Sequence, residues 1–259
     1  MSRFRILLVP SLTELEWAIR PLIEEWAEVA SFDAPGVGDE PPDEGHLLDA
    51  SARRGLAELD RRQWDRCVIV GDEYGAGVAT RMAAARPASV QALVLGHACL
   101  HYRREGERPS LSPEVADWVL RLARLDFRAF ARQMFTGWDP RQGAMGVPAH
   151  HDAVADRYLQ RVSSEGARTY LAAIMSEGTS QEPSLAEKLR GLDAPLLLVK
   201  HEGCVLFTPE GYEDAVAAMP QAKTASTPVK PSVSPEFATL LRDFCEAALG
   251  DRSEAMRPR

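Results

Sequence analysis

A short acidic turn at residues 71–75 is the part of this sequence best suited to chemistry. Its residues are Gly71-Asp72-Glu73-Tyr74-Gly75, between an apolar, β-branched run and an alanine-rich helical pattern. The flanking glycines permit a tight, strained turn between a strand and a helix. Such a turn would hold the Glu73 carboxylate at a strand end, where it could act as a general acid or base or as a nucleophile.

The turn resembles a nucleophile elbow of the Gly-x-Ser-x-Gly type, with Glu73 in place of the serine. In that motif, backbone amides beside the elbow form an oxyanion hole that stabilises negative charge on a substrate oxygen. The resemblance implies that the amides of Leu12 and Tyr74 are the donors here. Asp72 could interact favourably with the dipole of the helix that follows.

Other segments are similar to the α/β-hydrolase superfamily, in the family's order and along nearly the whole chain. They are an opening strand that ends at Pro10-Ser11, the turn Asp33-Ala34-Pro35-Gly36-Val37-Gly38, strands at 90–95 and 194–199, and a last helix from Pro235. The resemblance implies an α/β-hydrolase fold, with a mostly parallel central sheet flanked by helices. It also implies a core of residues 1–100 and 193–259, an inserted helical lid at 101–192, and a structural role for Asp33 in its turn.

The alternation of strand-like and helical patterns predicts the same fold class without the resemblance. Strand-like runs lie at residues 5–9, 28–33, 66–70, 90–95 and 194–199. They alternate with helical patterns such as residues 46–62, which implies a parallel sheet with helices on both faces. Ligands of such sheets bind at the carboxyl ends of the strands. From 101 to 192 the pattern is helical throughout, so this segment should add no strand to the sheet.

The three positions at which the superfamily carries its Ser-His-Asp triad all hold another residue type. Glu73 stands at the nucleophile, Cys204 or Gly203 stands at the acid, and residues 226–232 contain no histidine before the last helix. Triad chemistry needs a nucleophile, a base and an orienting acid together. Ordinary esterase, lipase or peptidase activity is therefore not expected.

Three functions stay open. The favoured one is an enzyme that uses Glu73, unpaired beneath an apolar lid that would raise its pKa, as general base or acid on a small, partly apolar metabolite. The reaction would be an elimination, isomerisation or cyclisation rather than a hydrolysis. The second is an unusual hydrolase with Glu73 as nucleophile or as base for water. The third is an inactive protein that binds a ligand or scaffolds a partner, against which stands the desolvation cost of an idle carboxylate.

Histidines at strand ends are the expected helpers of Glu73. His97 and His201 follow two of the predicted strands, and His101 begins the lid segment. Because these positions share the carboxyl edge of the sheet, their side chains could converge on one cleft with Glu73. For each histidine taken singly, a hydrogen bond to a loop carbonyl is the competing interpretation.

A helical lid over the strand ends would shape an apolar pocket. The expected lining residues are His101, Trp118, Phe127, Phe130, Met134, Trp138 and Cys204. The competing interpretation is that most of the aromatic and apolar lid side chains are buried against each other.

Composition and charge limit the partners and cofactors. A chain of 259 residues with 45% hydrophobic content can bury a full α/β core and still carry an inserted subdomain. The net charge of -8 argues against a nucleic-acid or anionic-membrane partner, which leaves a small-molecule substrate and an open possibility of a homodimer. Neither the four cysteines nor His150-His151-Asp152 has the spacing of a metal site, so no metal or other cofactor is expected.

The first residues and the choice of basic residues suggest where the protein works. The apolar stretch near the N-terminus stops at Pro10, too early for a spanning helix or a secretory signal, which predicts a cytoplasmic protein. Among the basic residues, arginine strongly outnumbers lysine, which occurs only at Lys188, Lys200, Lys223 and Lys230. Together with abundant alanine, this bias is typical of a high-GC bacterial source and favours specialised metabolism.

Overall fold

The computed structural model describes residues 4–11, 17–41, 43, 47–96, 113–129, 156, 159–162, 185–201 and 209–255. Several predicted site residues lie outside these ranges, and their roles stay predictions. They are Leu12, His97, His101, Phe130, Met134, Trp138 and Cys204.

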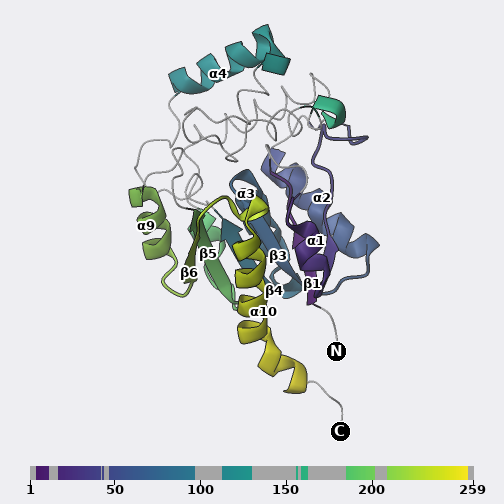
Figure 1. Cartoon of the computed structure of the whole chain (residues 1–259), viewed down its shortest axis with the longest axis vertical. Coiled ribbons are helices and arrows are strands. Elements are labelled where there is room, and N and C mark those ends of the chain that lie inside the picture. The colour runs from purple at the N-terminus through teal and green to yellow at the C-terminus, as the bar shows by residue number, and fades with distance from the viewer. Residues whose placement is uncertain are drawn as a thin grey trace.

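In the described part of the chain, six strands form one central sheet in the order β2-β1-β3-β4-β5-β6 (Figure 1). The strands are β1 (Phe4–Leu8), β2 (Ala27–Ala30), β3 (Cys67–Asp72), β4 (Val90–Gly96), β5 (Leu196–His201) and β6 (Lys223–Thr227). Every neighbouring pair is parallel. The sheet confirms the α/β fold class predicted from the alternation of patterns.

Helices cover both faces of the sheet, with α10 in front of it in the view of Figure 1. The helices are α1 (Arg20–Glu24), α2 (Leu47–Arg61), α3 (Tyr74–Ala85), α4 (Pro113–Leu125), α8 (Leu185–Lys188), α9 (Pro209–Ala218) and α10 (Pro235–Ala255), with short 3₁₀ turns η1 (Pro87–Ser89) and η3 (Pro231–Val233). Helices α2 and α3 contribute to one buried apolar cluster, whereas α1 and α10 contribute to the other. In the residues that the structure describes, no helix is long and apolar enough to cross a membrane.

The central strands are apolar along their whole length because both of their faces are buried. In β3, Ile69 points into the cluster that includes α2 and α3, while Val68 and Val70 point into the cluster that includes α10. Each of these three side chains is fully buried. Alternate burial on two faces is the physical reason that such strands appear in a sequence as continuous apolar runs.

Strand β6 was not predicted from the sequence. Its residues are Lys-Thr-Ala-Ser-Thr, and only Thr227 is buried. Because β6 lies at the edge of the sheet and is largely exposed, it needs no apolar run. Strand β6 therefore lacks the continuous apolar run that indicates a buried strand in a sequence.

The described part of residues 101–192 is helical and adds no strand to the central sheet, as expected from its pattern. It is attached to the turn at residues 33–38. Arg161 forms an ion pair with Asp33, and the Gly38 N–H donates to the Arg161 carbonyl at 2.8 Å. Val37 and Val162 form an isolated antiparallel bridge beside them. Asp33 thus binds a residue of the proposed lid as well as occupying its own turn.

Replacing Arg161 with methionine should loosen this attachment without unfolding the protein. Both partners of the ion pair are about one-third exposed, at 31% and 34%, so the pair contributes about 1 kcal/mol or less. Hydrogen exchange at the Gly38 amide, which donates to Arg161, should become several-fold faster. Arg128→Met, which removes a more exposed ion pair with Asp156, is the control and should leave Gly38 unchanged. Equal exchange at Gly38 in Arg161→Met and the wild type would contradict the attachment.

Candidate active site

Glu73 occupies the turn between β3 and α3 in a strained backbone conformation. Its φ is 50° and its ψ is -116°, and helix α3 begins at the next residue, Tyr74. Positive φ is uncommon for a residue other than glycine and costs about 1–3 kcal/mol. The turn is fixed by the Glu73 N–H, which donates to the Gly96 carbonyl at 2.9 Å. This is the strained strand-to-helix turn that the flanking glycines predicted.

The glycines on either side of Glu73 are required by close packing. A Cβ atom at Gly71 would lie 2.2 Å from the Gly75 carbonyl oxygen. A Cβ atom at Gly75 would lie 3.1 Å from the carbonyl oxygens of both Val9 and Pro10. The end of β1 therefore packs directly against the first turn of α3, next to Glu73.

The structure pairs Glu73 with Lys230. The Lys230 Nζ lies 3.0 Å from the Glu73 Oε1, and the two side chains are only 11% and 12% exposed. Lys230 comes just before η3 and α10, in the segment where the superfamily resemblance places the triad histidine. Lys230 was not predicted from the sequence, because the superfamily resemblance implies a histidine in that segment. The expectation that Glu73 lacks a charged partner is wrong.

The pairing determines the charge state of the site. An ammonium within hydrogen-bond distance favours the ionised carboxylate, and the N-terminus of α3 adds a favourable partial charge. The ammonium also offsets the desolvation cost of holding Glu73 largely out of water. The site therefore brings a carboxyl oxygen and a lysine nitrogen within 3.0 Å, and about a tenth of each side chain stays accessible.

A second carboxylate lies behind the elbow. Asp72 ends β3 and is fully buried. A Cβ atom at Gly96 would meet its Oδ1 at 2.4 Å and the Pro231 ring at 3.1 Å. Asp72 and Pro231, the residue after Lys230, thus both lie against the end of β4. The N-cap residue of α3 is Glu73, and its side chain makes no capping hydrogen bond.

Two predicted residues lie at the same edge of the sheet as Glu73. Tyr74 is the first residue of α3 and its side chain is buried, at 3% exposure. Its backbone amide therefore belongs to the helix N-terminus, while its role as an oxyanion donor stays a prediction. His201 ends β5, in register with Thr227 of β6, and is half-buried. Because β4 separates β3 from β5, the His201 backbone is about 10 Å from that of Glu73.

Two predicted pocket residues lie in or next to α4. Phe127 is 8% exposed and belongs to the buried cluster that also contains α2 and α3. Phe127 is thus buried in a cluster that joins residues 123 and 162 of the proposed lid to the core helices, rather than among lid side chains alone. Trp118 lies within α4. The pocket-lining role of both residues stays a prediction.

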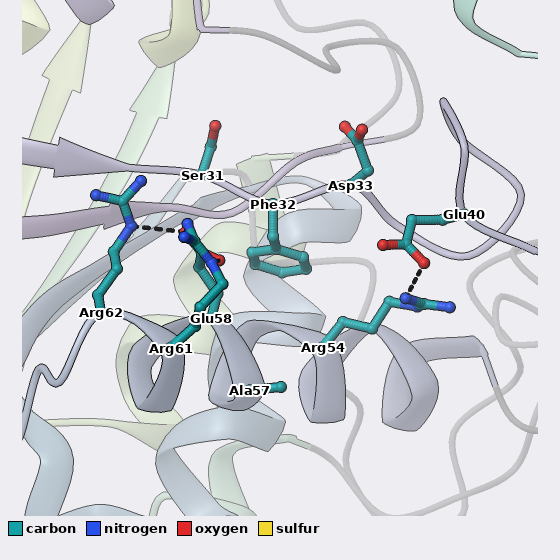
Figure 2. Close-up of a pocket in the computed structure, with 9 residues that line it drawn as sticks. All are labelled: Ser31, Phe32, Asp33, Glu40, Arg54, Ala57, Glu58, Arg61 and Arg62. Carbon is teal, nitrogen blue, oxygen red and sulfur yellow. Dashed lines mark hydrogen bonds and ion pairs between the residues drawn. The ribbon is translucent and has the colours of Figure 1, made fainter.

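A cavity of about 510 Å³ lies elsewhere, between α2 and the loop after β2 (Figure 2). It is lined by Ser31, Phe32, Asp33, Glu40, Arg54, Ala57, Glu58, Arg61 and Arg62. Its charged side chains include ion pairs such as Arg54 with Glu40 and Arg62 with Glu58. A hydrogen bond from Arg61 holds the pKa of Glu58 below its usual range. The cavity lies beside α2, away from the carboxyl end of β3, and its Arg54–Glu40 pair is more exposed than the Glu73–Lys230 pair, so Glu73 and Lys230 are the stronger candidates.

Other reactive groups in the described part of the chain do not compete with Glu73. Cys67 and Cys245 are free and buried, and burial raises the pKa of each thiol to about 12. Both cysteines are therefore protonated and unreactive at neutral pH. Among the described residues, no cluster of three His, Cys, Asp or Glu side chains could hold a metal ion.

Comparison with known proteins relates the chain to others by its fold. No family model and no curated protein sequence matches it. Solved structures match nearly its whole length. The enol-lactonase from Burkholderia xenovorans LB400 has a TM-score of 0.74 and 18% identity, covering 94% of this chain and 92% of that chain. The bromoperoxidase from Bacillus anthracis has a TM-score of 0.71 and 17% identity, covering 96% and 91%.

A further match comes from work on carboxylesterases of Nitrososphaera gargenis, with a TM-score of 0.73 and 14% identity, covering 96% of this chain and 92% of that chain. At such low identity the likeness shows the fold and not the activity. These neighbours are α/β-hydrolase enzymes, and the six-stranded parallel sheet matches theirs. The chain has the α/β-hydrolase fold.

Breaking the Glu73–Lys230 pair from either side should destabilise the protein. Glu73→Gln leaves the Lys230 ammonium without its partner in a largely buried site. Lys230→Met leaves the Glu73 carboxylate without its partner in the same site. Each variant should lose on the order of 2–4 kcal/mol of unfolding free energy. The double variant should recover about 1–3 kcal/mol relative to the sum of the two losses. Urea unfolding of all four proteins measures this coupling, and strictly additive losses would show that the two side chains do not interact.

Proposed function

We propose that this protein is an α/β-hydrolase-fold enzyme that lacks the Ser-His-Asp triad and uses Glu73 as general base or acid. Its substrate is a small, partly apolar metabolite, and its reaction is an elimination, isomerisation or cyclisation rather than a hydrolysis. One observation carries the proposal. A glutamate at the tip of the strained elbow lies 3.0 Å from a lysine in the segment that precedes α10.

The chemistry of Lys230 argues against the serine-hydrolase mechanism. In that mechanism the group in the histidine's place must accept a proton from the nucleophile or from water. A lysine ammonium has three donors and no acceptor, so it cannot take that proton while charged. A covalent ester on Glu73 would likewise lack a neighbouring base to activate water at this position. Proton transfer by Glu73 itself needs neither step.

The geometry of Glu73 supports proton transfer. Its backbone is fixed by the elbow, and its carboxylate is held by Lys230 yet keeps 12% of its surface exposed. A general base must be ionised, oriented and reachable by the substrate. Once Glu73 has taken a proton, the same carboxyl group can return it to another substrate atom as a general acid. The proposed lid at residues 101–192 would cover this edge of the sheet and exclude water.

A second candidate function, ligand binding without catalysis, is favoured by the same ion pair. An idle buried carboxylate is costly only when it is unpaired. Because Lys230 compensates the charge of Glu73, the desolvation argument against an inactive protein loses much of its weight. The two candidates differ in whether any compound is converted.

Mass spectrometry of a bacterial metabolite extract incubated with the protein separates these functions. An isomerase or cyclase keeps the mass of its substrate, a lyase removes a small molecule, and a hydrolase adds one water. We expect the conversion of at least one compound without the addition of water. If compounds are retained by the protein but none is converted, the binding function holds and the enzymatic proposal fails.

Replacing Glu73 with glutamine should then lower the conversion by about 10²-fold or more, since the amide is isosteric but cannot accept the proton. Glu58→Gln is the matched control, because Glu58 is 11% exposed, against 12% for Glu73, and is also ion-paired but lies on α2 beside the cavity of Figure 2. The rate should be unchanged in Glu58→Gln. Undiminished conversion by folded Glu73→Gln would refute the role of Glu73.

A serine-directed fluorophosphonate probe should leave the wild-type protein unlabelled. The elbow carries a carboxylate rather than a hydroxyl, and the nearby Ser11 is only 1% exposed. Neither provides a serine activated by a base. Intact-protein mass spectrometry with an ordinary serine esterase as positive control detects any adduct. Stoichiometric labelling at Ser11 would show that the nucleophile has been assigned to the wrong residue.

A further inference from the structure

We infer that Lys230 is a second acting group and that the substrate is a carbonyl compound with a hydrogen on the carbon next to the carbonyl. Glu73 would remove that hydrogen as a proton while Lys230 binds the carbonyl oxygen and stabilises the enolate. The inference rests on the proposed function of Glu73, and it adds a reaction step and a substrate class.

The separation of the two groups fits this substrate. The Glu73 Oε1 and the Lys230 Nζ are 3.0 Å apart. In a carbonyl compound, the α-carbon and the carbonyl oxygen are roughly 2.4 Å apart, as follows from the C–C and C=O bond lengths. One substrate can therefore present its α-hydrogen to the carboxylate and its oxygen to the ammonium at the same time.

Both groups are held by well-fixed backbone. Glu73 is fixed by the elbow, and Lys230, with φ -47° and ψ 137°, is followed by Pro231, which disfavours the helical conformation at Lys230. The segment is further held by the Thr227 hydroxyl, which donates to the Val229 carbonyl at 2.7 Å, and by the Val233 N–H, which donates to the Lys230 carbonyl at 3.1 Å. Fixed groups can stabilise a transition state without first being reoriented.

The step conserves the ion pair of the site. The C–H bond breaks, the proton moves to Glu73, the electron pair forms a carbon–carbon double bond, and the carbonyl π electrons move to oxygen. Before the step Lys230 faces a carboxylate, and after it Lys230 faces an enolate oxygen beside a neutral carboxyl group. The number of charges is unchanged, so little solvent or protein reorganisation is needed. Lys230 can then give a proton to the enolate oxygen, which yields the enol.

The strength of the base points to the same substrate class. A carboxylate is a weak base towards a carbon acid, and here an ammonium and the N-terminus of α3 lie beside it. A weak base removes a proton from carbon only where the resulting anion is itself stabilised. A carbonyl oxygen in contact with the same ammonium provides that stabilisation, whereas an isolated C–H bond does not.

Deuterium exchange tests the inference with a defined probe. Phenylacetone in buffered D₂O has α-hydrogens that exchange slowly without a catalyst, and NMR measures their replacement. We expect the wild-type protein to accelerate exchange over buffer. Glu73→Gln should lower the protein-dependent rate by about 10²-fold or more, and Lys230→Met by about 10-fold or more. Glu58→Gln and the exposed-site variant Lys188→Met are controls and should match the wild type.

The pH profile separates an acting lysine from one that only positions Glu73. If Lys230 works as a cation and proton donor, the protein-dependent rate should fall on the alkaline side as its ammonium deprotonates. Lys230→Arg should keep part of the rate and lose that alkaline fall, because a guanidinium stays protonated. An unchanged alkaline fall in Lys230→Arg would mean that another group titrates and would overturn the role of Lys230. Thermal unfolding of each variant confirms that it is folded.

The exchange results distinguish a failure of the inference about Lys230 from a failure of the proposed function of Glu73. If Glu73→Gln is inactive but Lys230→Met exchanges like the wild type, Lys230 is not an acting group while the proposed function of Glu73 stands. If Glu73→Gln exchanges at the full rate, both proposals fall. If the wild type exchanges neither phenylacetone nor acetophenone-type methyl ketones faster than buffer, the carbonyl inference is overturned, and the metabolite-extract experiment alone decides the proposed function.

Discussion

The close packing of the turn at residues 71–75 is the constraint on which the site depends. A carboxylate can be held at this strand end only because Gly71 and Gly75 let the turn close against itself and against the end of β1. The strained backbone of Glu73 persists because β3, β4 and α3 fix it from three sides. The buried two-faced sheet supplies the stability that compensates this strain, which is the usual arrangement at functional sites.

The second constraint is electrostatic. A largely buried carboxylate at the elbow requires a positive charge nearby, and Lys230 supplies it from a segment more than 150 residues further along the chain. The parallel topology makes this contact possible, because the ends of successive strands and the loops that follow them gather at one edge of the sheet. Fold and charge together produce a rigid pair of opposite charges where the superfamily resemblance places a serine and a histidine.

Much of this arrangement could be predicted from the sequence. The other parts could not be predicted, and there are physical reasons for this. The buried strands β1, β3, β4 and β5 were predictable because burial on two faces demands continuous apolar runs. The exposed edge strand β6 carries no such signal. The elbow at Glu73 was predictable because the two glycines that permit the turn lie within two residues of Glu73 in the sequence. Lys230 was not, because its importance lies in a long-range ion pair, and its own segment shows only an ordinary basic residue between prolines.

The pair also gives a physical reason for Glu73 and Lys230 to occur together. Glutamate at the elbow without a cation would leave a desolvated negative charge, and lysine before α10 without a carboxylate would leave a desolvated positive one. Each residue is costly alone and tolerable with the other. The unit of function to consider at this site is therefore the pair. In the proposed function the pair acts as a base and a cation 3.0 Å apart, and an enolate oxygen would replace the carboxylate as the anion that faces Lys230.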